Sequence, residues 1–351
     1  MQPVFRIVAD GKDITALIND RLLMLRTTDK PAMESDDFEL RIDDRDGALA
    51  LPTRGAHIEV YLGYAGRELA RLGRYVVDQF TVSGPPSTLE ISGKASDMRG
   101  TGKTIRSGSW EDVPLLQIVQ DIAARNGWQA QCKVETRVPR VDQVNESDLN
   151  FITRLALQYD CTAKIAEGNL LVLPRQGGQS ASGKNLGTVT LAPQEVSSWR
   201  FQLEDRGTYK AVQTRYQDSK TGEQKVVELT NPDAPNSLQT VYIDRHLYPN
   251  RAAAEQAAKA RLAAFNRGSA RVSLEMAGRA DLFAERMLLV QGFKDGLDGE
   301  YLIDSVSHTF SSGGWTTSVQ CNGGKQGKAK ARSQKTRQTK PVKAEKPKGQ
   351  P

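Results

Sequence analysis

The hexapeptide "GRYVVD" (residues 73–78) recurs as "GEYLID" (residues 299–304). Both copies place a tyrosine two residues after a glycine, followed by two apolar residues and an aspartate. An apolar run ending in a glycine and an aromatic residue precedes each copy, at residues 63–64 and 292–293. The interval between these landmarks differs by a few residues, as a loop insertion would cause. The sequence therefore predicts an internal repeat over residues 57–84 and 286–313.

The segments around both copies alternate between apolar and polar residues. In "HIEVYLGY" (residues 57–64), Ile58, Val60 and Leu62 share one face. Similar alternation occurs in "FELRI" (38–42), "TLEISG" (88–93) and most segments from residue 188 to 322. Period-two alternation interrupted by glycine, proline and aspartate is typical of antiparallel strands. We expect a mainly β, α+β fold with two similar small antiparallel β-barrel domains. Three such chains in a ring would present six similar domains and could join a sixfold object to a threefold one.

An α/β domain is predicted between the barrels. Apolar residues recur at helical spacing in "PLLQIVQDIAARNG" (114–127), with Pro114 in the first turn and Gly127 at the stop. A second helix is predicted after Ser147 as N-cap, with Leu149, Ile152, Leu155, Ala156 and Tyr159 on one face. A hairpin follows in "CTAKIAEGNLLVLP" (161–174). We expect an Ala-rich helix, capped by Asn250, within the second barrel domain.

Four regions are predicted along the chain. They are a first β-barrel domain (1–100), the α/β domain (101–180), a second β-barrel domain with the Ala-rich helix (181–322) and a basic tail (323–351). The tail carries ten Lys or Arg and one Glu, whereas residues 1–322 have a net charge of −3. It has one valine as its large apolar residue, so we expect it to be disordered. Contact with nucleic acid and a solubilising role both remain open for it.

No apolar run reaches the roughly 18 residues of a membrane helix, and the N-terminus lacks the apolar core of a signal peptide. We therefore expect the chain to fold in a cytoplasm without a membrane-spanning segment. Its cysteines (Cys132, Cys161, Cys321) and histidines (His57, His246, His308) are scattered and form no metal-binding pattern. No metal or cofactor is predicted.

The stretch "RGTGKTIRSG" (99–108) contains the Gly-Lys-Thr of a phosphate-binding loop. Such a loop needs a further glycine five positions before Gly102, where this chain has Asp97. The preceding strand is polar, and helical spacing begins only after Trp110. We therefore interpret the stretch as a basic, flexible exit from the first barrel, and expect Lys103→Ala to leave assembly largely intact.

Carboxylates suggest no active site either. Glu146 and Asp148 lie at a helix start, where acidic residues favour the helix dipole. Asp43, Asp44 and Asp46 lie in a turn-like run. No catalytic residue is predicted, and the repeated Tyr75, Asp78, Tyr301 and Asp304 are expected to form the barrels. A tail-associated cell-wall hydrolase remains the alternative function.

Three segments resemble phage tail hub proteins called late control protein D, and the hub portion of type VI secretion VgrG proteins. They are residues 93–128, residues 145–174 with "ESDLNF", and residues 288–322 with the Gly-Phe and Gly-x-Tyr features. Together these segments span most of residues 1–322.

The resemblance implies a non-enzymatic baseplate hub of a contractile phage tail or tail-like particle, assembled in the bacterial cytoplasm. The hub would be a homotrimer with a pseudo-sixfold ring, between the hexameric tail tube and the trimeric spike and beside other baseplate proteins. Long spike repeats are absent after residue 322, so a separate spike protein is expected as a partner.

Overall fold

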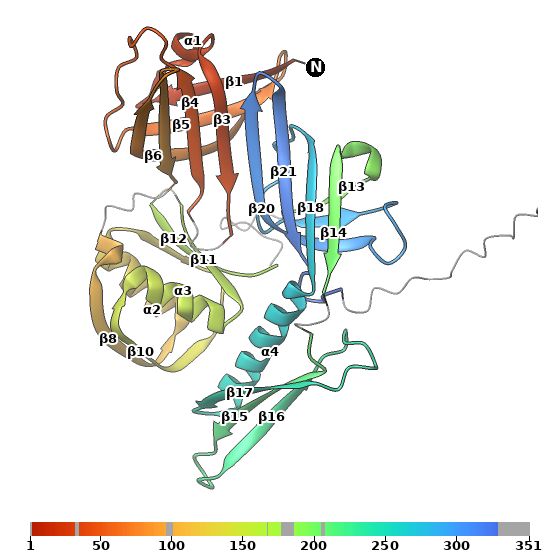
Figure 1. Ribbon diagram of the computed structural model, residues 1–351. Helices are drawn as coiled ribbons and strands as arrows, with labels where there is room; N and C mark the ends of the chain where they lie inside the picture. Colours follow the sequence, from red (N-terminus) through yellow and green to blue (C-terminus); the bar gives the residue numbers. More distant parts are fainter. Residues whose placement is uncertain are drawn as a thin grey trace, which may run out of the picture.

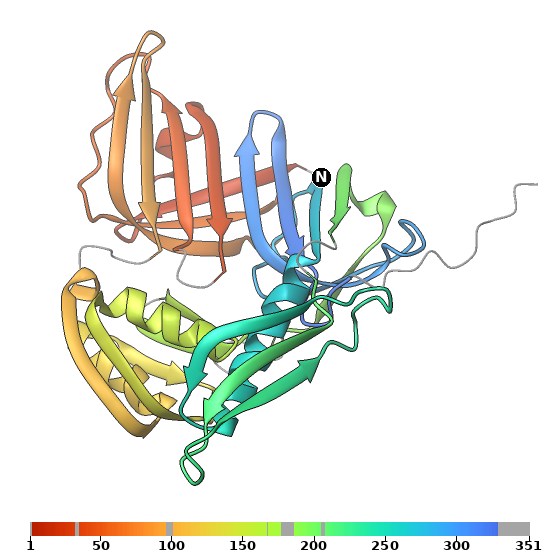
Figure 2. The same cartoon turned by 60° about the horizontal axis from the view of Figure 1, so that its bottom comes forward.

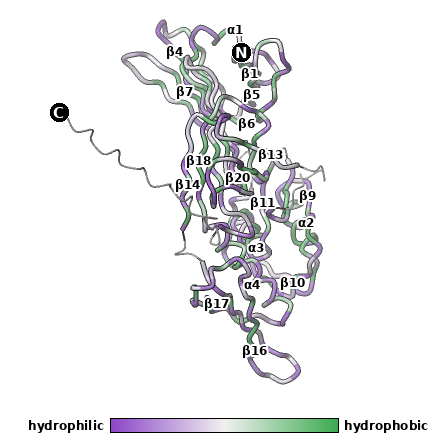
Figure 3. Tube along the Cα trace, turned by 90° about the vertical axis from the view of Figure 1, so that its right-hand side faces the viewer, coloured by the Kyte–Doolittle hydropathy of each residue, from purple (hydrophilic) through white to green (hydrophobic). Residues whose placement is uncertain are grey.

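The computed structural model describes residues 2–31, 35–95, 101–166, 168–176, 186–204 and 208–328. Antiparallel strands dominate them. Two β units lie side by side at one end of the molecule, an α/β unit lies below the first, and a smaller sheet with a long helix lies at the far end (Figure 1). The side view in Figure 3 shows this elongation, with β4 and β7 near one end and β16 near the other.

The first β unit comprises residues 2–95. Its elements are β1 (Pro3–Ala9), β2 (Lys12–Asp13), α1 (Thr15–Ile18), β3 (Leu22–Asp29), β4 (Asp37–Asp43), β5 (His57–Tyr64), β6 (Ala70–Ser83) and β7 (Thr88–Lys94). The main strands pair in the order β3-β4-β7-β6-β5-β1, all antiparallel. Alternate residues such as Phe38, Leu40 and Ile42 enter one core, which explains the period-two pattern.

The second β unit has the same strand order. Its elements are β13 (Thr188–Leu191), the 3-10 turn η2 (Pro193–Glu195), β14 (Ser198–Leu203), β18 (Ala270–Ala277), β19 (Met287–Val290), β20 (Gly299–Ser311) and β21 (Gly314–Asn322). They pair as β14-β18-β21-β20-β19-β13. One difference is that β13 pairs parallel with β19, whereas β1 pairs antiparallel with β5. Among the described residues, pairing closes neither unit into a complete ring of strands.

The α/β unit packs two helices against short sheets. It contains the 3-10 turn η1 (Thr101–Lys103), β8 (Ile105–Pro114), α2 (Leu115–Asn126), β9 (Gln129–Cys132), β10 (Arg137–Ser147), α3 (Asp148–Gln158), β11 (Cys161–Ala166) and β12 (Asn169–Pro174). Both predicted helices are confirmed. Ser147 caps α3 by accepting from the Asn150 N–H at 3.3 Å, and left-handed Gly127 (φ 71°) ends α2.

Two local predictions in this unit are wrong. Pro114 is the N-cap of α2 and not a first-turn residue, because its extended backbone (ψ 143°) also ends β8. The stretch from residue 105 to 108 is not a flexible linker. It is the start of β8 and pairs with β10, with Arg106 opposite Glu146. The polar side chains that suggested a linker are those of a two-stranded sheet exposed on one side.

Residues between β14 and β18 form a separate insertion. It comprises β15 (Ala211–Gln217), β16 (Gln224–Thr230), β17 (Val241–Tyr248) and α4 (Arg251–Gly268). The strands form their own sheet, β16-β15-β17, which α4 covers (Figure 2). These strands do not belong to the second barrel, where they were expected, because alternation identifies a strand but not its sheet. Asn250 caps α4 as predicted, accepting from the Ala253 N–H at 2.9 Å.

The beginning of the predicted disordered tail is ordered. The N–H of Gly323 donates to the Arg267 carbonyl at 2.9 Å, and the N–H of Lys328 to Ser269 Oγ at 2.7 Å. The remainder, residues 329–351, lies outside the described residues. Among the helices of the described segments, none has the length and apolar character needed to cross a membrane.

Candidate functional site: the repeated strands and the junction between the β units

The repeated tyrosines occupy matching, buried positions. Tyr75 lies opposite Ile58 across β5 and β6, and Tyr301 lies opposite Leu288 across β19 and β20. Their exposed fractions are 2% and 0%. Tyr301 Oη donates to the Leu297 carbonyl at 2.6 Å. Burial raises the pKa of both phenols, so each acts as a neutral core residue.

The repeated aspartates are bulge residues. The β6–β7 register shifts between Val77 and Gln79, which leaves Asp78 as the extra residue. The β20–β21 register shifts in the same way between Ile303 and Ser305, around Asp304. Both aspartates are exposed. A bulge bends a strand and increases its twist, so the repeated motif encodes the same bend in each unit.

The strand registers also agree residue by residue. Seven residues of β7 pair with β4, beginning with Lys94 opposite Asp37. Seven residues of β21 pair with β18 in the same register, beginning with Asn322 opposite Arg271. The pairs β5–β6 and β19–β20 also correspond, as do β6–β7 and β20–β21 with their bulges. The two units are therefore structural copies, with the 211–268 insertion replacing the short β3–β4 connection.

One antiparallel pairing fuses the two units. The second half of β20 pairs with β3, from Val306 opposite Asp29 to Ser311 opposite Met24. Leu25, Thr27, Val306 and His308 are at most 5% exposed at this junction. His308 Nδ1 lies 3.0 Å from Thr317 Oγ1, and burial lowers the pKa of His308 to about 4. The side chains buried at this junction are thus uncharged.

The β20–β21 hairpin also reaches the first core. Trp315 belongs to the first unit's cluster of buried side chains and packs against Tyr64, with ring centroids 5.3 Å apart. Tyr64 Oη donates to the Gly278 carbonyl at 3.0 Å. Gly278 must remain glycine, since an added Cβ would lie 1.9 Å from the Trp315 ring. Sequence reasoning missed these residues, because their roles depend on contacts between distant segments.

A charged cluster fixes the α/β unit to both β units. Lys164 Nζ donates to Asp36 Oδ1 at 2.8 Å and to Asp29 Oδ1 at 3.0 Å. The other oxygen of Asp29 accepts from the Ala284 N–H at 2.7 Å, in the second β unit. Burial and the neighbouring charge of Asp29 raise the pKa of Asp36 to about 6. Lys164 therefore joins the α/β unit to the first β unit, and Asp29 extends the cluster to the second.

Glu146 and Asp148 are held by arginines. Glu146 accepts from Arg154 through both oxygens, at 2.8 and 3.2 Å. Asp148 is fully buried, with Arg106 and Arg125 within 3.4 and 3.6 Å. Gln143 and Asn126 donate to Asp148 at 2.9 Å each. A buried carboxylate between two arginines has no access to a polysaccharide.

The aspartates of the predicted turn serve the turn. Asp43 and Asp44 accept from the N–H groups of Arg45 and Leu49 at 2.9 and 3.1 Å. Asp46 forms a two-oxygen pair with Arg21 at 2.6 Å. Their carboxylates are directed to separate local partners.

The Gly-Lys-Thr segment is a packed turn. Gly102 is buried, and an added Cβ would lie 2.8 Å from Trp128 Cη2 and 3.2 Å from Leu149 Cγ. Lys103 is exposed in η1. Asp97, on which the comparison with a phosphate loop depends, lies outside the described residues.

Cys161 lies in the core of the α/β unit and Cys132 packs against that core, whereas Cys321 lies in the core of the second β unit. Cys161 and Cys321 are buried and Cys132 is half-buried, all as free thiols. His57 and His246 are exposed. Within the described segments no group of three His, Cys, Asp or Glu could hold a metal ion.

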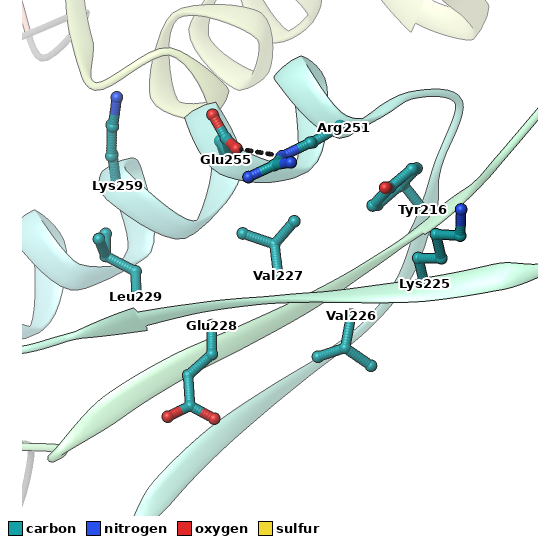
Figure 4. Close-up of a pocket in the computed structure, with 9 residues that line it drawn as sticks. All are labelled: Tyr216, Lys225, Val226, Val227, Glu228, Leu229, Arg251, Glu255 and Lys259. Carbon is teal, nitrogen blue, oxygen red and sulfur yellow. Dashed lines mark hydrogen bonds and ion pairs between the residues drawn. The ribbon is translucent and has the colours of Figure 1, made fainter.

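A cavity of about 600 Å³ lies between β16 and α4 (Figure 4). Four of its charged side chains, those of Lys225, Glu228, Arg251 and Glu255, pair with one another or with neighbours. Arg251 Nε lies 2.7 Å from Glu255 Oε1, and Lys225 Nζ lies 2.5 Å from Asp218 Oδ2. The cavity is therefore a solvated groove between a helix and an edge strand, without converging reactive groups.

Comparison with known proteins identifies the family. The family described as phage tail baseplate hub (GPD) matches residues 32–314. A probable baseplate hub protein of Escherichia phage 186 is 32% identical, over 91% of this chain and 92% of that protein. The chain belongs to the phage tail baseplate hub family. Its function is that of a hub in the phage tail baseplate.

Solved structures share the hub's fold. The 43 kDa tail protein of prophage MuSo2 from Shewanella oneidensis superposes with a TM-score of 0.68 at 17% identity, over 91% of this chain and 98% of that one. The Escherichia coli c3393 protein, a type VI secretion component similar to T4 tail proteins gp27 and gp5, superposes with a TM-score of 0.55 at 13% identity, over 86% and 73%. The resemblance to phage hubs and to secretion proteins is confirmed.

Proposed function

We propose that three copies of this hub form a ring of six small β barrels that joins a hexameric tail tube to a trimeric spike in a contractile tail. The agreement of strand registers between the two β units carries this proposal. A trimer of a chain with two equivalent units offers sixfold-like contacts on one face and keeps threefold symmetry overall. The ring would use residues 1–100 and the β strands of residues 181–322 that lie outside the insertion. The α/β unit (101–180) and the insertion would face the spike or other baseplate proteins.

The hub is proposed to act mechanically, without catalysis. The arginine pairs of Glu146 and Asp148 support this, because they remove both carboxylates from a role as general acid. The hydrolase alternative is tested by incubating the protein with purified peptidoglycan. We expect no turbidity loss; clearing by the parent that Glu146→Gln abolishes would support the hydrolase instead.

Assembly in the bacterial cytoplasm and contact of residues 329–351 with nucleic acid are further parts of the proposal. The basic composition of the tail supports the latter. Salt-sensitive DNA binding by the full chain, lost on deleting residues 329–351, is the expected result. Equal binding by the truncated chain would contradict it.

The oligomeric state tests the ring directly. Light scattering after size exclusion should give three chain masses, alone or with the spike protein, and electron microscopy should show a threefold ring. A monomer in both states would contradict the proposed ring.

A further inference from the structure

The junction between β20 and β3 leaves two strand edges without a counterpart. Because the units are copies, the second half of β6 corresponds to the second half of β20, and β14 corresponds to β3. Within the described residues, β14 ends the sheet, and no strand pairs with residues 79–83 of β6 on the side away from β7. One chain thus carries one complete junction and the two halves of a second. In Figure 1, β6 and β14 lie on opposite sides of the layer formed by the β units.

The backbone hydrogen bonds that lead up to the unpaired part of β6 match those that lead up to the paired part of β20. Val77 exchanges hydrogen bonds with the backbone at Gly55 and Ala56 (2.8 and 2.9 Å), and Ile303 does so with Glu285 and Arg286 (2.9 Å each). Beyond this point β20 passes to β3, whereas β6 continues to Ser83 without a strand on that side. The β6 edge therefore equals the β20 edge with its partner removed.

The exposed apolar side chains lie where the complete junction buries its own. Val82, 53% exposed, corresponds to His308, 5% exposed. On β14, Trp199 is 49% exposed and corresponds to Leu25, which is fully buried. Trp199 and Phe201 contact Phe293 on the same face, with ring centroids 5.7 and 5.4 Å apart. An unpaired edge strand with an exposed apolar face is normally an assembly surface.

We propose that β6 of one copy pairs antiparallel with β14 of the next copy, with Val82 opposite Phe201 as His308 lies opposite Thr27. The same offset places Phe80 opposite Leu203 and Ser83 opposite Arg200. This inference rests on the proposed hub ring, because a head-to-tail contact closes only when rotation brings the last edge to the first. The strand that pairs with each edge comes from a second copy of this chain, because the β20–β3 junction within one chain already shows the same pairing.

Disulfide trapping tests the register. Opposed residues of antiparallel strands have Cα atoms about 4.5–5.5 Å apart, within disulfide range. Val82→Cys/Phe201→Cys should therefore give covalent trimers under mild oxidation, and a mixture of the two single variants should give covalent dimers. Each single variant alone should stay uncrosslinked. Thr27→Cys/His308→Cys, the equivalent pair within one chain, is the positive control, and Val82→Cys/Leu203→Cys, displaced by two residues, is the register control.

A charge variant provides the second measurement. Val82→Asp should weaken trimer association at least tenfold without changing the unfolding midpoint of the monomer. Val226→Asp, at a 59% exposed valine on β16 of the insertion, is the matched control and should leave association unchanged. Trimers that form without the Val82–Phe201 cross-link and tolerate Val82→Asp would overturn the edge pairing while the ring survives. Monomers alone and with the spike would overturn both.

Discussion

His308 of β20 and Thr27 of β3 lie opposite each other in the antiparallel pairing that fuses the two β units, although almost the whole chain separates them. Both side chains are buried, so the face of each strand that carries them is shielded from solvent. The pairing joins the strands of the two β units into one continuous sheet. Its chemistry leads to the first prediction.

His308 should make stability depend on pH. Burial lowers its pKa from 6.5 to about 4, so the unfolded state binds more protons between these values. The stabilisation is fully present above pH 6.5 and is lost as the pH falls toward 4, by up to about 3 kcal/mol. Urea unfolding should therefore show that His308→Gln loses less stability than the parent over this range.

Asp36 has the opposite sign in a similar window, because its raised pKa makes stability fall as the pH rises. Asp36 is present in both proteins, so the difference between parent and His308→Gln isolates the histidine. Parallel pH profiles of the two proteins would refute the prediction.

Removing the lysine that joins the α/β unit to the first β unit should destabilise the hub. Lys164→Met leaves Asp29 and Asp36 close together without their shared cation, and we expect a loss of about 2 kcal/mol. Adding Asp36→Asn should restore part of it. Lys259→Met, at an exposed position of α4, is the control and should change the free energy of unfolding by less than about 0.5 kcal/mol. Equal effects of the two lysine variants would count against the cluster.

The repeated tyrosine should contribute mostly through packing. Tyr301→Phe loses the hydrogen bond to the Leu297 carbonyl and should cost about 1 kcal/mol. Tyr301→Ala also leaves a cavity in the second core and should cost about 4 kcal/mol. Denaturant unfolding measures both. A larger effect of Tyr301→Phe than of Tyr301→Ala is incompatible with this account.

The Gly-Lys-Thr turn should respond to packing and not to charge. Gly102→Val places a side chain against Trp128 and Leu149 and should cost about 1–3 kcal/mol. Lys103→Ala should change the free energy of unfolding by less than about 0.5 kcal/mol. The fraction of protein that assembles should stay within a few per cent of the parent. Calorimetry with ATP should give no binding for the parent. Clear binding that Lys103→Ala abolishes would restore the phosphate-loop interpretation.

Local sequence determined the elements of this protein. Apolar residues at helical spacing identified α2 and α3. Helix ends were marked by Ser147, Gly127 and Asn250, and alternation identified most strands. The hexapeptide repeat predicted two related β units. Strands that follow the same backbone path require the same residue types, here a tyrosine in the core and an aspartate at the bulge. These features depend on residues close in the chain.

The tertiary structure decided which strands share a sheet and which charges meet. Alternation could not separate β15–β17 from the second β unit, nor show that β20 pairs with β3. Asp148 has the sequence signature of a helix-start acid, yet it is buried between two arginines. Lys164 meets its carboxylates only after the α/β unit and the first β unit have folded together. Such contacts form between segments far apart in the chain, and their energy depends on geometry and burial that no local pattern contains.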